Sequence, residues 1–538
     1  MATTARCSIA LAGLVSCLGL TVQGAPITGA PALGDLRKVG AVDFPTSCAA
    51  EVRVDFARAV ALLHSFFYEE ARRLFTEVAR RDPGCGIAHW GVAMTWVHPL
   101  WSPPSDDELK LGQEAVAAAR TTGAGSARER ELITAIAAYY GEPAGAGAAG
   151  AAAVGQGCHG PSGGHPARAR AYADAMERVH QRYPRDVEAT AFYALALLGA
   201  ASPVDPTLAT QLAAASLLED LWKRRRNRNH PGLAHYLIHA YDYPSVAARG
   251  LDAAKSYAAI APWVPHALHM PSHIFTRLGM WDESIRTNLA SAEASRDYAA
   301  RFHPGAAAFE ELHAMDYLVY AYLQIGDEAR ARQIVDQVAS VKQTHPANDF
   351  VAAYAVGAIP ARYALERHAW REAATLPVPV ASFWAHFPFA EAHLEFAHAL
   401  GRARSGDLPG ARQALDRLQQ LRDATTDPRH RYFARHLDVQ RQAASAWVAR
   451  ADGNDARALE LLRQAADAED ALGKHPVSPG AIFPVRELLG ELLLDLGRPA
   501  EARVAYEASL KIYPGRRTGL RGLARSQALL AQAPPAAP

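Results

Sequence analysis

The stretch RELLGELLLDLGRPAEARVAYEASLKIYPG, residues 486–515, has the clearest fold pattern in the chain. It carries the pair Leu489-Gly490, then Ala502, Tyr506 and Pro514. Small residues at packing positions let two helices approach closely, so the stretch predicts two antiparallel helices. A unit of this size buries its apolar face only against a neighbouring unit, and we therefore searched the chain for further copies.

The spacing of these residues resembles the tetratricopeptide repeat (TPR), whose pattern is L-G, then A-x3-F, then P over about 34 residues. The segment LLHSFFYEEARRLFTEVARRDPG, residues 62–84, supplies Ala71, Phe75 and Pro83 at the same offsets. Weaker matches follow four turns, LGMWDES, IGDEARA, SGDLPGA and DGNDARA, at the point where the first helix of a repeat ends; their glycines are Gly279, Gly326, Gly406 and Gly453. The resemblance implies an all-α, TPR-like α-solenoid of roughly eight to ten repeats, irregular in the middle.

The chain divides into segments by composition and repeat spacing. We expect a signal peptide (1–24), N-terminal repeats (45–140), a low-complexity Gly/Ala-rich insertion (141–165), central repeats (166–345), C-terminal repeats (346–530) and a disordered tail (531–538).

The N-terminus predicts export. One arginine precedes an apolar core from Ile9 to Val22, and small residues follow around Gly24, which is typical of a signal peptide. An alternative is a lipoprotein box ending at Cys17, which would leave that residue acylated, but the residues after it stay apolar. No other stretch approaches 18 uninterrupted apolar residues. We expect an exported protein of the bacterial periplasm or cell envelope without a transmembrane segment.

Export would permit a disulfide. Cys48 lies just before one predicted helix and Cys85 just after its antiparallel partner, so a helical hairpin would bring them together. The alternative is two buried free thiols. If Cys48 and Cys85 form the disulfide, Cys158 in the Gly-rich insertion would be left over.

Charge and motifs exclude several classes of function. The formal net charge is +1, so no overall field favours nucleic acid or an anionic membrane. The one basic cluster, KRRRNRN from Lys223, is expected at a solvated helix end. The sequence contains no H-E-x-x-H, G-x-S-x-G, P-loop or dinucleotide fingerprint, and whether the protein is an enzyme stays open.

Two histidine stretches are separated by one repeat length. In PGLAHYLIHAYDYP from Pro231 and PHALHMPSHIFTRLGMW from Pro265, His235 and His269 are 34 residues apart, as are His239 and His273. In proteins similar to the TPR family, first-helix positions 2, 5, 9, 12 and 13 line the concave face. The repeat phase places on that face His235, His239, Asp242, His266, His269, His273, His313 and Asp316.

Imidazoles on adjacent helices can reach a common metal ion, and residues i and i+4 share a helix face. We expect His235, His239, His269 and His273 to form the core of a metal site, assisted by His266, His313, Asp242 and Asp316. The aspartates would be ligands or would orient imidazole N–H groups. A set rich in imidazole and without thiolate suits Zn, Cu(II), Ni or Fe(II), and the affinity order favours copper.

Pro271 lies inside the second histidine stretch. It should kink the helix, because it cannot donate a backbone hydrogen bond. Alternatively, Ser272 caps a new helix there. The blocks HPGLAHYLIHAYDYP and PHALHMPSHIFTRLGMW also resemble those of a group of exported bacterial TPR proteins with His-rich central repeats, and this resemblance implies an envelope location and no particular activity.

Three functions are compatible with these residues. The first is a solenoid that binds a transition metal in a histidine-lined groove for storage, carriage or catalysis. The second is a non-catalytic scaffold that binds a peptide, partner protein or small molecule in the same groove. The third is a metal-dependent enzyme, which would need an open coordination position on the metal.

Overall fold

The computed structural model describes residues 38–100, 102–141, 164–202, 205–379 and 386–532. The predicted signal peptide with Cys17, most of the Gly/Ala-rich insertion with Cys158, and residues 533–538 of the predicted tail lie outside the described residues. Signal cleavage and acylation therefore stay predictions.

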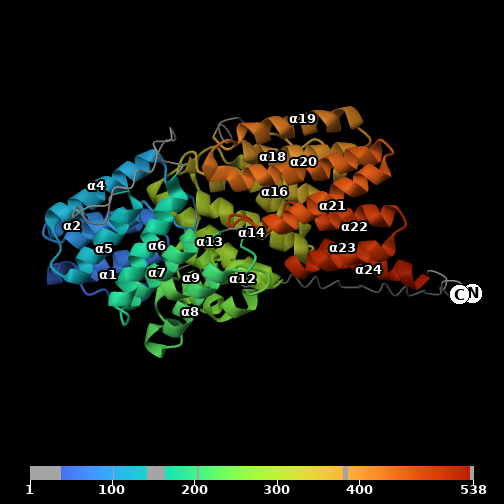
Figure 1. Cartoon of the computed structure of the whole chain (residues 1–538). Coiled ribbons are helices and arrows are strands. Elements are labelled where there is room, and N and C mark those ends of the chain that lie inside the picture. The colour runs from blue at the N-terminus through green and yellow to red at the C-terminus, as the bar shows by residue number, and fades with distance from the viewer. Residues whose placement is uncertain (1–37, 101, 142–163, 203–204, 380–385, 533–538) are drawn as a thin grey trace, which may run out of the picture.

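The described chain is almost entirely helical, and most successive helices pack as antiparallel pairs (Figure 1). In chain order the helices are α1 (Arg53–His64), α2 (Tyr68–Arg81), α3 (Gly86–Met94), α4 (Asp106–Thr122), α5 (Ala127–Tyr139), α6 (His165–Arg182), α7 (Val187–Ala200), α8 (Ala209–Trp222), α9 (Pro231–Tyr241), α10 (Leu251–Ile260), α11 (Pro265–His269), α12 (Pro271–Arg277), α13 (Trp281–Phe302), α14 (Phe309–Ile325), α15 (Glu328–Ser340), α16 (Phe350–Glu366), α17 (Trp370–Ala373), α18 (Pro388–Ser405), α19 (Leu408–Ala424), α20 (Arg431–Ala451), α21 (Asp455–Leu472), α22 (Val485–Asp495), α23 (Pro499–Ile512) and α24 (Arg517–Gln532). Two short strands, β1 (Ala307–Ala308) and β2 (Thr344–His345), pair in parallel. Within the described ranges, none of these helices combines the length and apolar character needed to cross a membrane.

The predicted TPR-like α-solenoid is confirmed by the packing of its repeats. Gly326 and Gly406 adopt the left-handed conformation immediately after α14 and α18, where the repeat pattern places the end of a first helix. A Cβ on Gly490 would lie 2.6 Å from the ring of Tyr506, so the small residue of α22 admits the aromatic residue of α23. The fold is an all-α solenoid of TPR-like helical hairpins.

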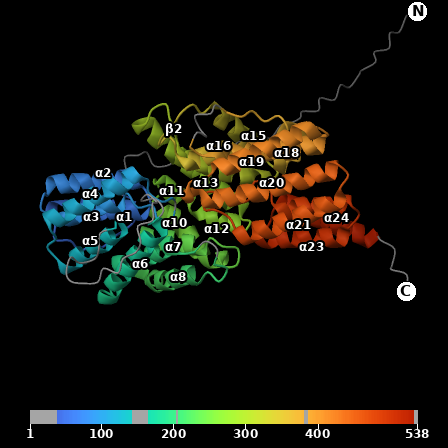
Figure 2. The same cartoon turned by 45° about the horizontal axis from the view of Figure 1, so that its top comes forward.

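The buried apolar residues form two clusters. One extends from Val39 to Tyr298 and the other from Ile285 to Tyr506. Figures 1 and 2 show the corresponding halves of the molecule, blue to green and yellow to red, meeting around α13 and α14.

The C-terminal repeats pack back against the central helices. The indole N–H of Trp281 donates to the carbonyl of Gly515 at 3.3 Å, across 234 residues of sequence. The backbone N–H of Arg517 donates to Gln324 at 3.0 Å. These contacts hold the turn between α23 and α24 against α13 and α14.

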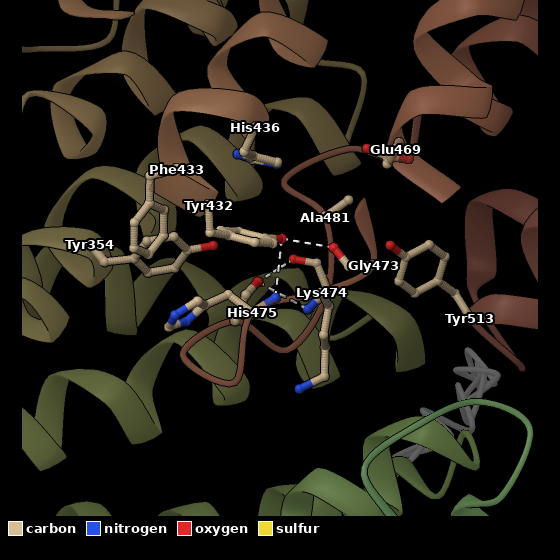
Figure 3. Close-up of a pocket in the computed structure, with 12 residues that line it drawn as sticks. Tyr354, Tyr432, Phe433, His436, Glu469, Gly473, Lys474, His475, Ala481 and Tyr513 are labelled. Atoms are coloured by element: carbon tan, nitrogen blue, oxygen red, sulfur yellow. Dashed lines mark hydrogen bonds between the residues drawn. The ribbon is translucent and has the colours of Figure 1, made fainter. Parts of the chain in front are cut away.

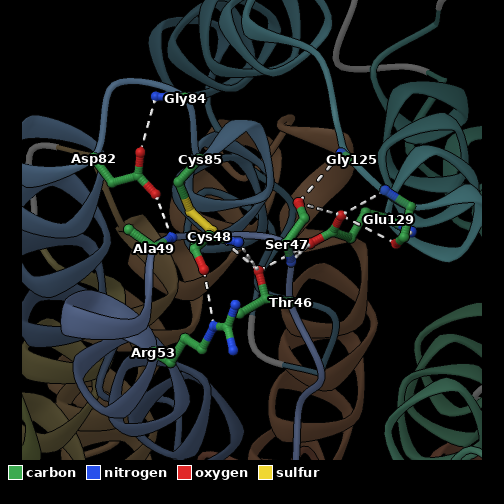
Figure 4. The surroundings of a disulfide bond; sticks show 11 residues. Thr46, Ser47, Cys48, Ala49, Arg53, Asp82, Gly84, Cys85, Gly125 and Glu129 are labelled. Carbon is green, nitrogen blue, oxygen red and sulfur yellow. Dashed lines mark hydrogen bonds between the residues drawn. A yellow bond between two sulfur atoms is a disulfide. The ribbon is translucent and has the colours of Figure 1, made fainter.

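The predicted disulfide between Cys48 and Cys85 is present, with the two Cα atoms 4.7 Å apart (Figure 4). Asp82 accepts a hydrogen bond of 2.7 Å from the backbone N–H of Ala49, and Glu129 accepts one of 2.8 Å from that of Ser47. The bridge therefore ties the segment before α1 to the turn after α2.

Candidate metal centre

Six histidines from four central helices meet in the interior. Each is at most 8% exposed: His235 and His239 of α9, His266 and His269 of α11, His273 of α12, and His313 of α14. All six were predicted from the repeat phase. The repeat phase identifies them because equivalent positions on the first helices of successive repeats face the same side of the solenoid.

The six histidines form two sets of three. The first set is His235, His239 and His266, and the second set is His269, His273 and His313. Within each set, one ring nitrogen from each residue lies within 4.8 Å of the others. The first set combines residues of α9 and α11, and the second set combines residues of α11, α12 and α14. The expectation of a four-histidine core with two assistants is replaced by this three-and-three arrangement.

The two sets are neighbours. The rings of His239 and His273 have centroids 6.1 Å apart, and those of His266 and His269 are 6.3 Å apart. Two ions held by these sets would therefore lie close to one another.

Prolines fix the helices that carry the histidines. Pro231 is the first residue of α9, where its missing N–H costs nothing, and the ring of His230 accepts from the backbone N–H of Leu233 at 3.3 Å. Pro271 separates α11 from α12 as expected. The alternative that Ser272 caps a new helix is wrong: the cap residue is Met270, which makes no side-chain cap, and Ser272 lies within α12.

Hydrogen bonds fix the protonated nitrogen of two rings in the second set. His273 Nδ1 donates to Asp242 at 2.9 Å, and His269 Nδ1 donates to Asn288 Oδ1 at 2.7 Å. The Asn288 amide group itself donates to the Ser284 carbonyl at 2.8 Å, which leaves its oxygen facing His269. In neutral imidazole the other nitrogen is then a bare acceptor.

The two bare acceptors face each other. Nε2 of His269 lies 3.0 Å from Nε2 of His273. Two lone pairs at this distance repel unless a cation lies between them. Nitrogens bound to one tetrahedral ion at 2.0–2.1 Å stand about 3.3 Å apart, so the separation is close to that of two ligands.

The first set is oriented in the same way. Nδ1 of His235 donates to the backbone carbonyl of His64 at 2.7 Å, and a carbonyl can only accept. Nε2 of His235 is therefore bare, and it lies 3.1 Å from Nε2 of both His239 and His266.

A buried hydrogen-bond network holds His64 in place. Its Nε2 donates to Glu188 at 2.7 Å, its Nδ1 accepts from the Tyr236 hydroxyl at 2.8 Å, and His230 donates to the other oxygen of Glu188 at 2.8 Å. Glu188, His64 and His230 also form a possible ligand group, but these bonds already use the ring nitrogens. We assign them to positioning the His64 carbonyl.

Burial favours the neutral form of all six imidazoles. Desolvation lowers the pKa of every one, to about 3 for His235, and the neighbouring imidazoles of each set lower the pKa values of His239, His266, His269 and His313 further. Neutral imidazole is the form that ligates a metal, so no proton has to leave before binding.

Asp242 is an orienting acceptor for His273. It also accepts from Arg277 Nε at 2.8 Å and from Lys474 Nζ at 2.9 Å. Burial works to raise the pKa of this carboxyl, but Lys474 and Arg277 outweigh it and hold the pKa well below its usual value. A carboxylate behind a ligating imidazole raises the basicity of that ligand.

Asp316 does not join the histidines. It pairs with Arg362 at 3.0 Å, and both side chains are buried. Arg362 also donates to the carbonyl of Ala481 at 2.7 Å, in the Lys474 loop, which we define as residues Gly473–Pro484 between α21 and α22. The predicted role of Asp316 at the metal is therefore replaced by one in holding this loop.

The site is enclosed rather than spread along an open groove. Lys474 extends from its loop to Asp242, and in Figure 3 its side chain points away from Tyr432 and His436. The Tyr432 hydroxyl fixes the loop by donating to the Gly473 carbonyl at 2.8 Å.

Phe66 covers the first set from the turn between α1 and α2. Its ring lies 4.4 Å from that of His235 and 5.5 Å from that of His266. It has a φ of +54°, which costs a non-glycine residue free energy and is maintained here by the surrounding packing.

Sequence reasoning missed several residues of the site: His64, Phe66, Arg277, Asn288, Tyr317 and Lys474. Arg277 could have been found, since it stands four residues after His273 on one helix face. The Tyr317 hydroxyl lies 3.5 Å from His273 Nε2 and donates to the Ser478 carbonyl at 3.2 Å. Lys474 and His64 come from distant repeats, and no local spacing marks them.

The fold and the site together define an α-solenoid of TPR-like hairpins that encloses two three-histidine sets. No protein family model matches the chain, and no curated protein matches its sequence. Matching solved structures include the APC/C hetero-tetramer Cut9-Hcn1 (11% identity, 90% of this chain and 78% of that chain, TM-score 0.35), yeast Tom70 (11%, 90% and 96%, 0.33) and the TPR domain of P58(IPK) (13%, 90% and 100%, 0.21). Superpositions of this quality say nothing about activity, and the fold assignment rests on the helical hairpins themselves.

Proposed function

We propose that this protein is an exported metal-binding solenoid that holds one transition-metal ion in each histidine set. One observation carries the proposal: His269 and His273 turn bare Nε2 atoms toward each other at 3.0 Å while each Nδ1 is held by an acceptor. A bound cation removes the repulsion that this arrangement would otherwise contain.

The ligand chemistry favours copper or zinc. Each set offers three imidazoles and no thiolate, and imidazole suits copper, zinc, nickel and iron. The affinity order among divalent ions places copper first, with zinc as the main alternative. Three ligands leave a position open on each ion, which is compatible with carriage or with catalysis.

The disulfide supports the exported location. Disulfides persist in oxidising compartments such as the bacterial periplasm, and the predicted signal peptide directs the chain there. N-terminal sequencing of protein from a periplasmic fraction tests this part: a mature terminus near Gly24 or Ala25 supports it, and an intact Met1 in a cytoplasmic fraction contradicts it.

Metal content is the test of the function. Protein without an affinity tag is analysed by mass spectrometry for bound metals, beside His235→Gln/His239→Gln and His269→Gln/His273→Gln. A matched control is His393→Gln/His398→Gln, which removes two buried histidines of α18 outside both sets. We expect two ions per chain in the wild type and the control, and one fewer in each set variant.

A peptide-binding scaffold is the second candidate. A cleft of about 630 Å³ beside the histidines favours it, because the interior of a solenoid is a common place for a ligand. Wild-type protein that lacks metal and takes up neither added zinc nor copper would overturn the metal function in favour of this scaffold.

A further inference from the structure

A cleft of about 630 Å³ adjoins the first set. His239, Asp242 and Lys474 are among the residues that line it, and Lys474 contacts Asp242 there at 2.9 Å. The residues between come from repeats far apart in sequence, including Leu100 and Tyr513. The volume is within the range of small-molecule sites.

The two sets differ in their access to this cleft. Among the described residues that line it, His239 is the one member of the six histidines. His239 is 8% exposed, whereas His269 and His313 are 2% exposed and Tyr317 packs on both of them. The first set therefore adjoins the cleft through His239, and the second set is covered by Tyr317.

The cleft has an excess of positive charge once the ions are bound. All six ligands are neutral, and two divalent ions bring roughly four positive charges. The described lining has four carboxylates, Asp205, Asp242, Glu469 and Asp470, beside the cations Arg277, Arg429 and Lys474, so one divalent ion at His239 leaves the cleft net positive. Arg277 and Lys474 share Asp242. A buried positive charge without a counter-charge is costly, so a ligand that brings a negative charge is stabilised there.

The walls of the cleft are suited to an apolar body. Prolines, leucines and tyrosine rings make up much of the lining: Pro99, Pro206, Leu198, Leu472, Tyr243 and Tyr513. Aromatic rings of a ligand pack well on such surfaces.

We propose that the cleft binds a small organic acid whose carboxylate faces the ion at His239 and the ammonium of Lys474, and whose apolar body lies among the prolines and tyrosines. This inference rests on the proposed function, because the first ion supplies part of the positive charge.

The test uses the full-length exported protein loaded with zinc. Isothermal titration calorimetry compares 3-phenylpropionate with its neutral analogue 3-phenylpropanamide, and metal content is measured on the same samples. We expect the acid to bind at least tenfold more tightly than the amide. Lys474→Gln should reduce that preference at least threefold, while Lys255→Gln, at an exposed position of α10, should leave it unchanged.

A second variant keeps the test informative where Lys474→Gln fails to fold. Ser245→Trp places a large side chain at an exposed position of the cleft lining and should weaken the binding of the acid without loss of metal. Metal-loaded protein that binds acid and amide equally, or neither, overturns the inference alone. Protein that binds no metal overturns the proposed function, and this inference with it.

Discussion

Lys474 donates to the same carboxylate oxygen of Asp242 that accepts from His273, although it lies 232 residues further along the chain. The C-terminal half of the solenoid therefore reaches a histidine of the central repeats through one aspartate. This contact links the loop after α21 to the second set.

Removal of the Asp242 charge should weaken metal binding at the second set. In Asp242→Asn the His273 imidazole loses its carboxylate partner, and such changes typically lower metal affinity 10- to 100-fold. The variant should also be less stable by about 3–5 kcal/mol, because Arg277 and Lys474 lose their buried counter-charge. Competition titration with a zinc chelator measures the affinity.

Asp316→Asn is the matched control for that variant, since Asp316 is also a buried aspartate paired with an arginine. It should lower the stability but leave the zinc affinity of correctly folded protein within about threefold of wild type. Equal losses of affinity in the two variants would contradict the assignment of Asp242 as the orienting acceptor.

Metal removal should destabilise the protein. A ligand that binds only the folded state contributes about 4 kcal/mol at a concentration 1,000 times its Kd, and here the loss also restores the repulsion between facing nitrogens. We expect a chelator to lower the Tm by several degrees and added zinc to restore it, as followed by calorimetry. The same chelator should not change the Tm of a variant with both histidine sets replaced by glutamine.

Stability should fall as the pH rises toward 8 because of Glu469. Burial raises its pKa from 4.5 to about 8, with smaller contributions from Asp470 and Glu487, against the opposing effect of Arg516 and the backbone N–H of Val485. The folded state thus holds a proton that the unfolded state releases above pH 4.5, so stability is lost between about pH 4.5 and 8.

Glu469→Gln removes this titration. Its Tm should match the wild type near pH 5 and exceed it at pH 8.5, whereas Glu114→Gln, an exposed change on α4, should follow the wild-type curve. Parallel pH curves for Glu469→Gln and wild type would show that Glu469 does not titrate in this range.

The disulfide should stabilise the first hairpin. Cys48 and Cys85 close a loop with a sequence separation of 37, and restriction of the unfolded chain by such a loop is worth about 3–4 kcal/mol. Cys48→Ser/Cys85→Ser should have a lower Tm than wild type under oxidising conditions. Addition of a reductant should lower the Tm of the wild type and leave that of the variant unchanged.

The repeat fold could be predicted because its signal is local. Gly490 and Tyr506, or Ala71 and Phe75, mark each hairpin within one segment of about 34 residues. The six histidines followed from the same phase. These six residues lie together because the first helices of adjacent repeats present equivalent residues to the same side of the solenoid.

The environment of the histidines could not be predicted in the same way. The repeat phase placed Asp316 on the same face as the histidines. It does not indicate that the buried guanidinium of Arg362 forms an ion pair with the Asp316 carboxylate. The repeat phase also does not specify the curvature of the solenoid. It therefore could not predict that Phe66 and Lys474 cover the histidines. These contacts depend on the cumulative rotation between repeats, which small changes in each packing interface alter.

Anomalous diffraction from crystals of untagged protein, grown after loading with zinc and measured at the zinc absorption edge, shows whether each histidine set binds an ion. We expect two peaks, one at 2.0–2.1 Å from the ring nitrogens of His235, His239 and His266 and one at the same distance from those of His269, His273 and His313. Crystals with no peak at either set, and with the six imidazoles in the same positions, would contradict this expectation.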